Sequence, residues 1–245
     1  MKKLIIAAAL FSPTLAHAEA QKPDSELMFM ADVTSDYRYR GISQTRLQPA
    51  LQGGIDYVNN PTGLYAGTWA STIKWIKDAG GDSNVEWDIY GGKRGEIAEN
   101  FTYDVGVLAY IYPSNNLDNV PGFEDANTVE VYAQLGFGPA YIKYSSSVTN
   151  LFGMMDSKNS GYLDVGANLP VGSGFTINLH AGHQKVENNS MYDYDDWKVG
   201  ATKDFDFASV ALAVIGTNAD EMMYFTPKGK FTGKTALVGT ITKMF

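Results

Sequence analysis

The chain has 245 residues with no cysteine, and its 19 Lys and Arg against 27 Asp and Glu give a net charge of −8 at pH 7. This acidic balance argues against a nucleic-acid partner, which would need basic patches. The lack of cysteine excludes disulfides, thiol catalysis and a lipid-modified N-terminal cysteine.

The N-terminus has the features of an export signal. Two lysines precede an apolar run over 4–15, and Ala16-His17-Ala18 follows it. This pattern predicts a secretory signal peptide over residues 1–18, cleaved after Ala18, with cleavage after Ala20 as the alternative. The apolar run is too short to span a bilayer as a helix. We therefore expect an exported protein whose mature part, residues 19–245, forms one domain.

Strand-type alternation recurs along the rest of the chain. Within 127–138, Val129, Val131 and Leu135 alternate with Glu130 and Gln134. A period of two over this length indicates a β-strand with one apolar face. The same reasoning predicts strands at about 27–34, 50–58, 64–75, 85–92, 101–112, 127–138, 140–148, 162–169, 175–181, 196–203, 207–216 and 235–245.

The connections between these segments alternate between long and short. Even strand numbers, with short turns at one end and long loops at the other, are typical of outer-membrane barrels. We therefore predict an all-β fold, a transmembrane antiparallel β-barrel of about 12 strands. A soluble periplasmic barrel with its apolar faces inward is the fold-level alternative. The segment 207–216 is apolar on both faces, so its orientation stays open.

Aromatic residues near the strand ends predict two girdles at the membrane interfaces. The short-turn girdle would contain Tyr57, Tyr65, Phe101, Tyr103, Phe137, Phe175 and Phe245, and the long-loop girdle Trp75, Trp87 and Trp197. A terminal Phe245 also suits recognition by the outer-membrane assembly machinery, although Lys243 stands where an aromatic residue is common. The expected surroundings are outer-membrane lipid and lipopolysaccharide.

If the apolar faces meet lipid, the alternate faces line a lumen. The candidate pore-lining residues are Asp56, Glu86, Asp88, Asp104, Glu130, Lys143, Asp164 and Lys198, with Asp32, Lys74 and Asp196 in the wider set. The excess of acidic residues favours a cation-preferring path for small solutes. Paired charges in a plugged, non-conducting interior are the alternative, since about 12 strands lie between filled and open barrels.

Enzymatic chemistry has little support. His180 and His183 fall on opposite faces of one strand, and neither G-x-S-x-G nor H-E-x-x-H occurs. An outer-membrane hydrolase built around one histidine stays the less favoured alternative. The acidic segment with Asp193, Asp195 and Asp196 offers calcium ligands without EF-hand spacing. We predict no catalytic residues, no metal site and no cofactor.

Several segments resemble a known family. They are SDYRYRGISQT at 35–45, PALQGGIDY at 49–57, GLYAGTWAS at 63–71 and EWDIYGG at 86–92. Together these segments are similar to the TorF-type porin family of proteobacterial outer-membrane proteins. The resemblance implies a Gram-negative outer-membrane barrel, in a family catalogued as of unknown function. Together with the predicted fold, it leads us to expect a channel for passive diffusion of small solutes. It implies no substrate and no functional residue.

The family-motif loop is polar and lies between the first two long strands. Its matched residues are Ser35, Tyr37, Arg40, Gly41, Ser43 and Thr45. We expect this loop to fold back against the lumen, with Arg40 pairing with an inward carboxylate. A structural anchor without a transport role is the alternative for this loop. A non-conducting barrel whose loops bind a partner is the alternative for the protein.

Overall fold

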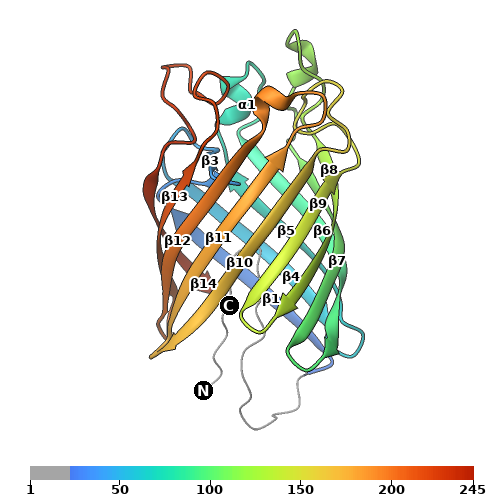
Figure 1. Cartoon of the computed structure of the whole chain (residues 1–245), viewed down its shortest axis with the longest axis vertical. Helices are drawn as coiled ribbons and strands as arrows, with labels where there is room; N and C mark the ends of the chain where they lie inside the picture. Colours follow the sequence, from blue (N-terminus) through green and yellow to red (C-terminus); the bar gives the residue numbers. More distant parts are fainter. Residues whose placement is uncertain (1–22) are drawn as a thin grey trace.

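The computed structural model describes residues 23–245, so the expected signal peptide lies outside the described residues. Twelve long strands close into one antiparallel barrel (Figure 1). The strands are β1 (Ser25–Thr34), β4 (Ala50–Asn59), β5 (Leu64–Thr72), β6 (Val85–Ala98), β7 (Phe101–Ile111), β8 (Thr128–Phe137), β9 (Ala140–Ser147), β10 (Gly161–Gly172), β11 (Phe175–Lys185), β12 (Tyr194–Asp204), β13 (Ser209–Thr217) and β14 (Ala236–Met244). The predicted fold class is confirmed.

Each strand pairs with its neighbour in sequence, and β1 closes the barrel by pairing with β14. The short turns gather at one end and the long loops at the other (Figure 1). The loop end also carries the short strands β2 (Arg38–Tyr39) and β3 (Ile42–Ser43), helix α1 (Trp75–Asp78), and the 3-10 turns η1 (Leu117–Asn119) and η2 (Ser190–Tyr192). Within residues 23–245, no helix has the length and apolar character needed to cross a membrane.

The two faces of the wall differ in the direction that a membrane requires. On β8, Val131 and Leu135 point outward and are 45% and 48% exposed, whereas Glu130 faces inward and is 2% exposed. Apolar residues outside and polar residues inside are the arrangement of a barrel surrounded by lipid. This excludes the soluble alternative, in which the apolar faces would pack inward.

The open question about the segment 207–216 is answered by strand pairing. On β13, Leu212 and Val214 face outward, and Val214 lies opposite the outward Val199 of β12. The inward positions carry Ala211, Ala213 and other residues without charge. The neighbouring register therefore sets an orientation that alternation alone could not.

Several predicted strand ends are wrong. The strands predicted over 162–169 and 175–181 continue to Gly172 and Lys185, and two further differences change which charges face the lumen. The strand predicted over 64–75 stops at Thr72, and Lys74 lies exposed in the following loop rather than in the lumen. The strand predicted over 85–92 continues to Ala98 and brings Arg94 to the inner face, where its guanidinium carbon lies 5.2 Å from the Tyr65 ring centre. Two glycines at 91–92 hid this continuation, because glycine weakens a strand signal.

Two aromatic assignments to the girdles are also wrong. Tyr65 points into the barrel, where its hydroxyl donates to Asp104 Oδ1 over 2.5 Å. Trp75 belongs to α1 and packs edge-on against Tyr112 with ring centres 5.2 Å apart. The other residues expected near the strand ends include the outward-facing Tyr57, Phe101, Phe137, Phe175, Phe245, Trp87 and Trp197.

The loops above β5 to β9 share a small apolar core. Ile73, Ile76 and Leu117 are fully buried there, and Trp75 and Phe152 pack against them. This core packs the loops that follow β5, β7 and β9 against one another.

A charge on the outer wall tests the assigned membrane face. Val131→Arg places a cation on the outward face near the middle of β8, so we expect a loss of about 2–4 kcal/mol in unfolding free energy. Gln134→Arg on the inward face of the same strand should cost much less. Urea unfolding of the protein refolded into vesicles measures both. Equal losses would contradict the assignment.

Candidate functional site: the lumen beneath the first loop

The inner face of the barrel is polar and rich in carboxylates. Every strand residue in the predicted pore-lining set points inward, namely Asp56, Glu86, Asp88, Asp104, Glu130, Lys143, Asp164 and Lys198. Asp32 and Asp196 of the wider set are also inward and buried. These placements bring the candidate residues to the inner face of one barrel.

Residues 35–49, called loop 1 below, fold inward from the end of β1. Their β2–β3 hairpin turns at Arg40 and Gly41, whose φ angles of 44° and 79° are both positive. Positive φ at both central residues is typical of the tight type I′ hairpin turn. A Cβ on Gly41 would lie 2.4 Å from Thr217 Cγ2, so only glycine lets the turn approach the wall this closely.

Asp36 holds the hairpin together from inside. Its carboxylate accepts hydrogen bonds from Arg38 Nε over 2.5 Å and from the hydroxyls of Ser43 over 2.5 Å and Thr45 over 3.2 Å. Arg38 also donates to the carbonyl oxygen of Thr232 in the last long loop, over 3.1 Å. The matched motif residues Ser43 and Thr45 therefore have a structural role in shaping loop 1.

Arg40 fastens loop 1 to the barrel wall. Its guanidinium donates to Glu130 Oε2 of β8 and to Gln184 Oε1 of β11, each over 2.7 Å. The guanidinium carbon also lies 4.1 Å from the Tyr162 ring centre and 4.7 Å from that of Tyr39. The expected pairing of Arg40 with an inward carboxylate is thus observed, and both charged side chains are almost fully buried.

Two tyrosines of loop 1 contact the strands β6 and β7, which precede β8 in the wall. The Tyr37 hydroxyl donates to Glu86 Oε1 over 2.6 Å, and Tyr39 donates to the Tyr110 hydroxyl over 3.2 Å. Burial raises the pKa of the Tyr37 phenol well above its ordinary value, and the carboxylates of Glu86 and Asp88 raise it further. Tyr37 therefore stays neutral and remains a hydrogen-bond donor to Glu86.

A second polar cluster lies on β10, β11 and β12. His180 Nδ1 lies 2.8 Å from Asp164 Oδ1, and its Nε2 lies 2.7 Å from Asp196 Oδ2. Tyr162 donates to Asp196 over 2.8 Å. Because each ring nitrogen faces a carboxylate, the arrangement suits a protonated imidazolium that donates twice. No ring nitrogen is then left to take a proton from a nucleophile, as a catalytic base must.

Towards the turn end of the barrel, a tyrosine donates to a carboxylate and a lysine lies over an aromatic ring. Tyr90 donates to Asp56 over 2.6 Å, and the Lys143 ammonium lies 4.1 Å from the Tyr132 ring centre. The inward bases of the described residues thus include Arg40, Arg94, Lys143 and Lys198. The sequence reasoning missed Arg94 and did not count Arg40, so the acidic excess of the lumen is smaller than predicted.

The candidate calcium ligands point in three directions. Asp196 faces the lumen and binds His180, whereas Asp195 lies outside, 2.7 Å from His183 Nδ1. Asp193 accepts from the backbone N–H of Val186 over 2.6 Å. Three carboxylates that do not converge cannot share one ion.

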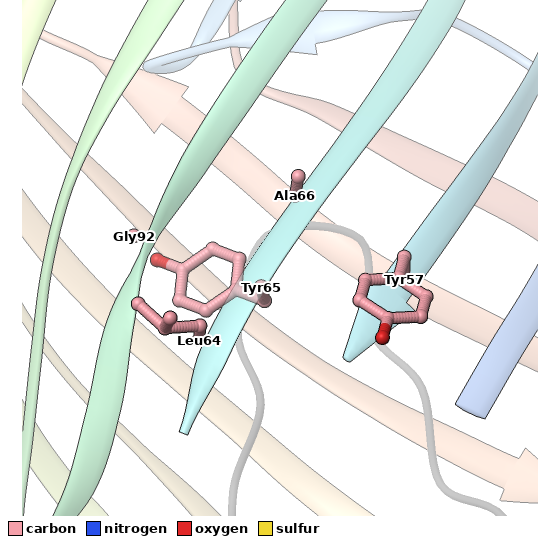
Figure 2. Close-up of a pocket in the computed structure, with 5 residues that line it drawn as sticks. All are labelled: Tyr57, Leu64, Tyr65, Ala66 and Gly92. Atoms are coloured by element: carbon pink, nitrogen blue, oxygen red, sulfur yellow. The ribbon is translucent and has the colours of Figure 1, made fainter. Parts of the chain in front are cut away.

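A hollow also lies on the wall near the turn end of β4, β5 and β6. It is lined by Tyr57, Leu64, Tyr65, Ala66 and Gly92 (Figure 2). A Cβ on Gly92 would lie 2.5 Å from the Tyr65 hydroxyl oxygen, so Gly92 makes room for this side chain. The lining holds no charged group, and the lumen is the stronger candidate site.

Comparison with solved structures places the fold among membrane barrels. A structure described as "KdgM porin" has a TM-score of 0.53 and 7% sequence identity, with 90% of this chain and 98% of that chain covered. A structure of LpxR from Salmonella typhimurium has a TM-score of 0.44 and 11% identity, with 89% and 99% covered. At these identities the likeness concerns the fold, and the second is too distant to support an argument.

Comparison with curated protein sequences finds no significant match. The profile of one bacterial family, described as "Bacterial protein of unknown function (Gcw_chp)", matches residues 19–245. That range includes every strand of the barrel and all of loop 1. The chain therefore belongs to the Gcw_chp family of bacterial proteins.

Proposed function

We propose that this protein is an outer-membrane channel for passive diffusion of small solutes, with a preference for cations. One observation carries the proposal: a closed barrel with an apolar outer face has an inner face lined by carboxylates. Rings of one charge favour counter-ions in a pore. The predicted export signal and the resemblance to the TorF-type porin family agree with this location and role.

Loop 1 would form the narrow part of the channel. It contacts inward side chains from five strands through Glu86, Tyr110, Glu130, Tyr162 and Gln184. A barrel of about 12 strands lies between filled 8-stranded barrels and open 16-stranded porins, so one inserted loop can restrict it strongly. Small solutes and hydrated ions are therefore the expected cargo.

The same contacts favour a second candidate function. If loop 1 fills the lumen completely, the protein is a non-conducting barrel with a structural role or a role in binding through its outer loops. The arrangement around His180 gives no support to a hydrolase, since both ring nitrogens are taken by carboxylates.

Planar bilayers with a KCl gradient test the channel and its selectivity. We expect ionic current with a reversal potential on the cation-selective side. The double variant Glu86→Gln, Asp88→Asn should move this potential towards zero, because it removes two inward charges. His183→Gln, which changes an exposed pair with Asp195 outside the lumen, should leave it unchanged. Correctly inserted protein without current would reject the channel and favour the second candidate.

A further inference from the structure

The hollow near the turn end of β4, β5 and β6 opens on the outer wall (Figure 2). Of its lining residues, Tyr57 and Leu64 are outward and exposed, and Ala66 lies two positions from Leu64 on the same face of β5. The volume of the hollow is about 420 Å³. Sites for small molecules typically have about 300–1,000 Å³, so the hollow is large enough for part of a ligand.

Small residues form the floor of this hollow. Ala66 is in register with Tyr57 of β4 on one side and with Gly91 of β6 on the other. A Cβ built on Gly91 would have Ala66 Cβ, 3.8 Å away, as its nearest side-chain atom. No bulky side chain therefore covers Gly91, and the large side chains of Tyr57 and Leu64 stand beside a low floor. This shape suits a narrow, flexible apolar chain.

A lysine lies beside the hollow. Lys93 of β6 is exposed and is in register with Leu64, one of the lining residues, and with the outward Val105 of β7. None of the ion pairs within residues 23–245 includes Lys93. The other outward positions of β4, β5 and β6 carry no charged residue. An ammonium group beside lipid requires a polar or anionic partner at the membrane interface.

The position of Lys93 along the barrel defines the kind of partner. Its register partner Leu64 is the first residue of β5, directly after a short turn. In outer-membrane barrels the short turns face the periplasm. The lipids of that leaflet are phospholipids, which carry a phosphate for an ammonium group and acyl chains for an apolar hollow. A small soluble anion would pair with Lys93 and leave the hollow empty.

We propose that the hollow and Lys93 form a binding site for one anionic phospholipid, such as phosphatidylglycerol. An acyl chain lies over Ala66 and Gly91, beside Tyr57 and Leu64, and the phosphate pairs with the Lys93 ammonium. The proposal rests on the outer-membrane location and not on conduction. A binding measurement in micelles therefore tests it separately from the channel proposal.

Native mass spectrometry of the refolded, delipidated protein in micelles counts the bound lipid molecules directly. Phosphatidylglycerol and zwitterionic phosphatidylethanolamine with the same acyl chains are titrated in parallel. We expect one phosphatidylglycerol to bind per chain, more tightly than phosphatidylethanolamine. Lys93→Gln should lower its affinity about fivefold, to that of phosphatidylethanolamine, since a lysine near an anionic lipid surface contributes about 1 kcal/mol. Ala66→Phe, which fills the hollow, should weaken the binding of both lipids.

Two variants of β12 are the matched controls. Lys203→Gln removes another lysine of the turn end, which donates to the carbonyl oxygen of Ser173, and Ala201→Phe adds the same ring to the outward face. Both should bind phosphatidylglycerol normally. Unchanged affinity in Lys93→Gln, or equal affinity of the wild type for the two lipids, would overturn the phosphate contact. Unchanged affinity in Ala66→Phe would overturn the acyl-chain site. Wild-type dimers that Ala66→Phe dissociates would show that a second copy occupies the hollow, which would also overturn the proposal.

Discussion

Replacing Arg40 with alanine should destabilise the barrel by about 3–5 kcal/mol, the usual cost of breaking a buried ion pair from one side. The variant leaves Glu130, which is 2% exposed, without its cationic partner, and it leaves Gln184 without its donor. It also frees loop 1 from β8 and β11. Urea unfolding of the protein refolded into vesicles, followed by tryptophan fluorescence, measures the loss.

Arg46→Ala is the control for this prediction. Arg46 also belongs to loop 1 and pairs with Asp78, but its side chain is 41% exposed. An exposed pair contributes about 1 kcal/mol or less, so this variant should stay close to the wild type. Similar losses in the two variants would show that Arg40 does not fasten the loop as described.

Replacing Gly41 with alanine should lower the unfolding free energy by about 2–4 kcal/mol and push the hairpin away from the wall. The new Cβ would lie 2.4 Å from Thr217 Cγ2 and 2.8 Å from Asp196 Cβ, at a φ of 79° that alanine tolerates poorly. The displaced turn carries Arg40 with it, so its hydrogen bond to Glu130 should weaken as well. Unfolding free energy measures the first effect.

Gly122→Ala is the control that separates the effect of the steric clash from the effect of backbone strain. Gly122 has a φ of 91°, and no atom lies within 4 Å of a Cβ built there. Strain alone should cost about 1 kcal/mol. If Gly41→Ala and Gly122→Ala lose the same unfolding free energy, the close approach of Gly41 to the wall is not the reason why this position needs glycine.

The architecture was largely predictable because a lipid-facing barrel repeats one simple pattern. Alternation of apolar and polar residues identified β8 almost to its ends, and counting such segments gave the strand number. The alternation of long and short connections then indicated a membrane barrel. Prediction failed where the pattern was interrupted. Glycines at 91–92 hid the end of β6. Both faces of β13 are apolar, so its sequence does not show which face points outward, and only its pairing with β12 determines this.

The site was predictable only in part. The sequence indicated that Arg40 would meet an inward carboxylate, but Glu130 lies 90 positions further along the chain and becomes its partner only when the barrel closes. The same is true of His180, which needs the register of β10, β11 and β12 to meet Asp164 and Asp196. Pairwise contacts across a barrel depend on closure and shear, which local periodicity does not encode.

Single-channel conductance of the wild type and Arg40→Ala in planar bilayers tests the central claim most directly, namely that loop 1 narrows a polar, conducting lumen. Small discrete steps in the wild type and larger steps in the variant are the predicted result, because releasing loop 1 widens the path. Both proteins inserted as native barrels with no conductance steps in either would contradict the account, and the lumen would then have to be regarded as closed.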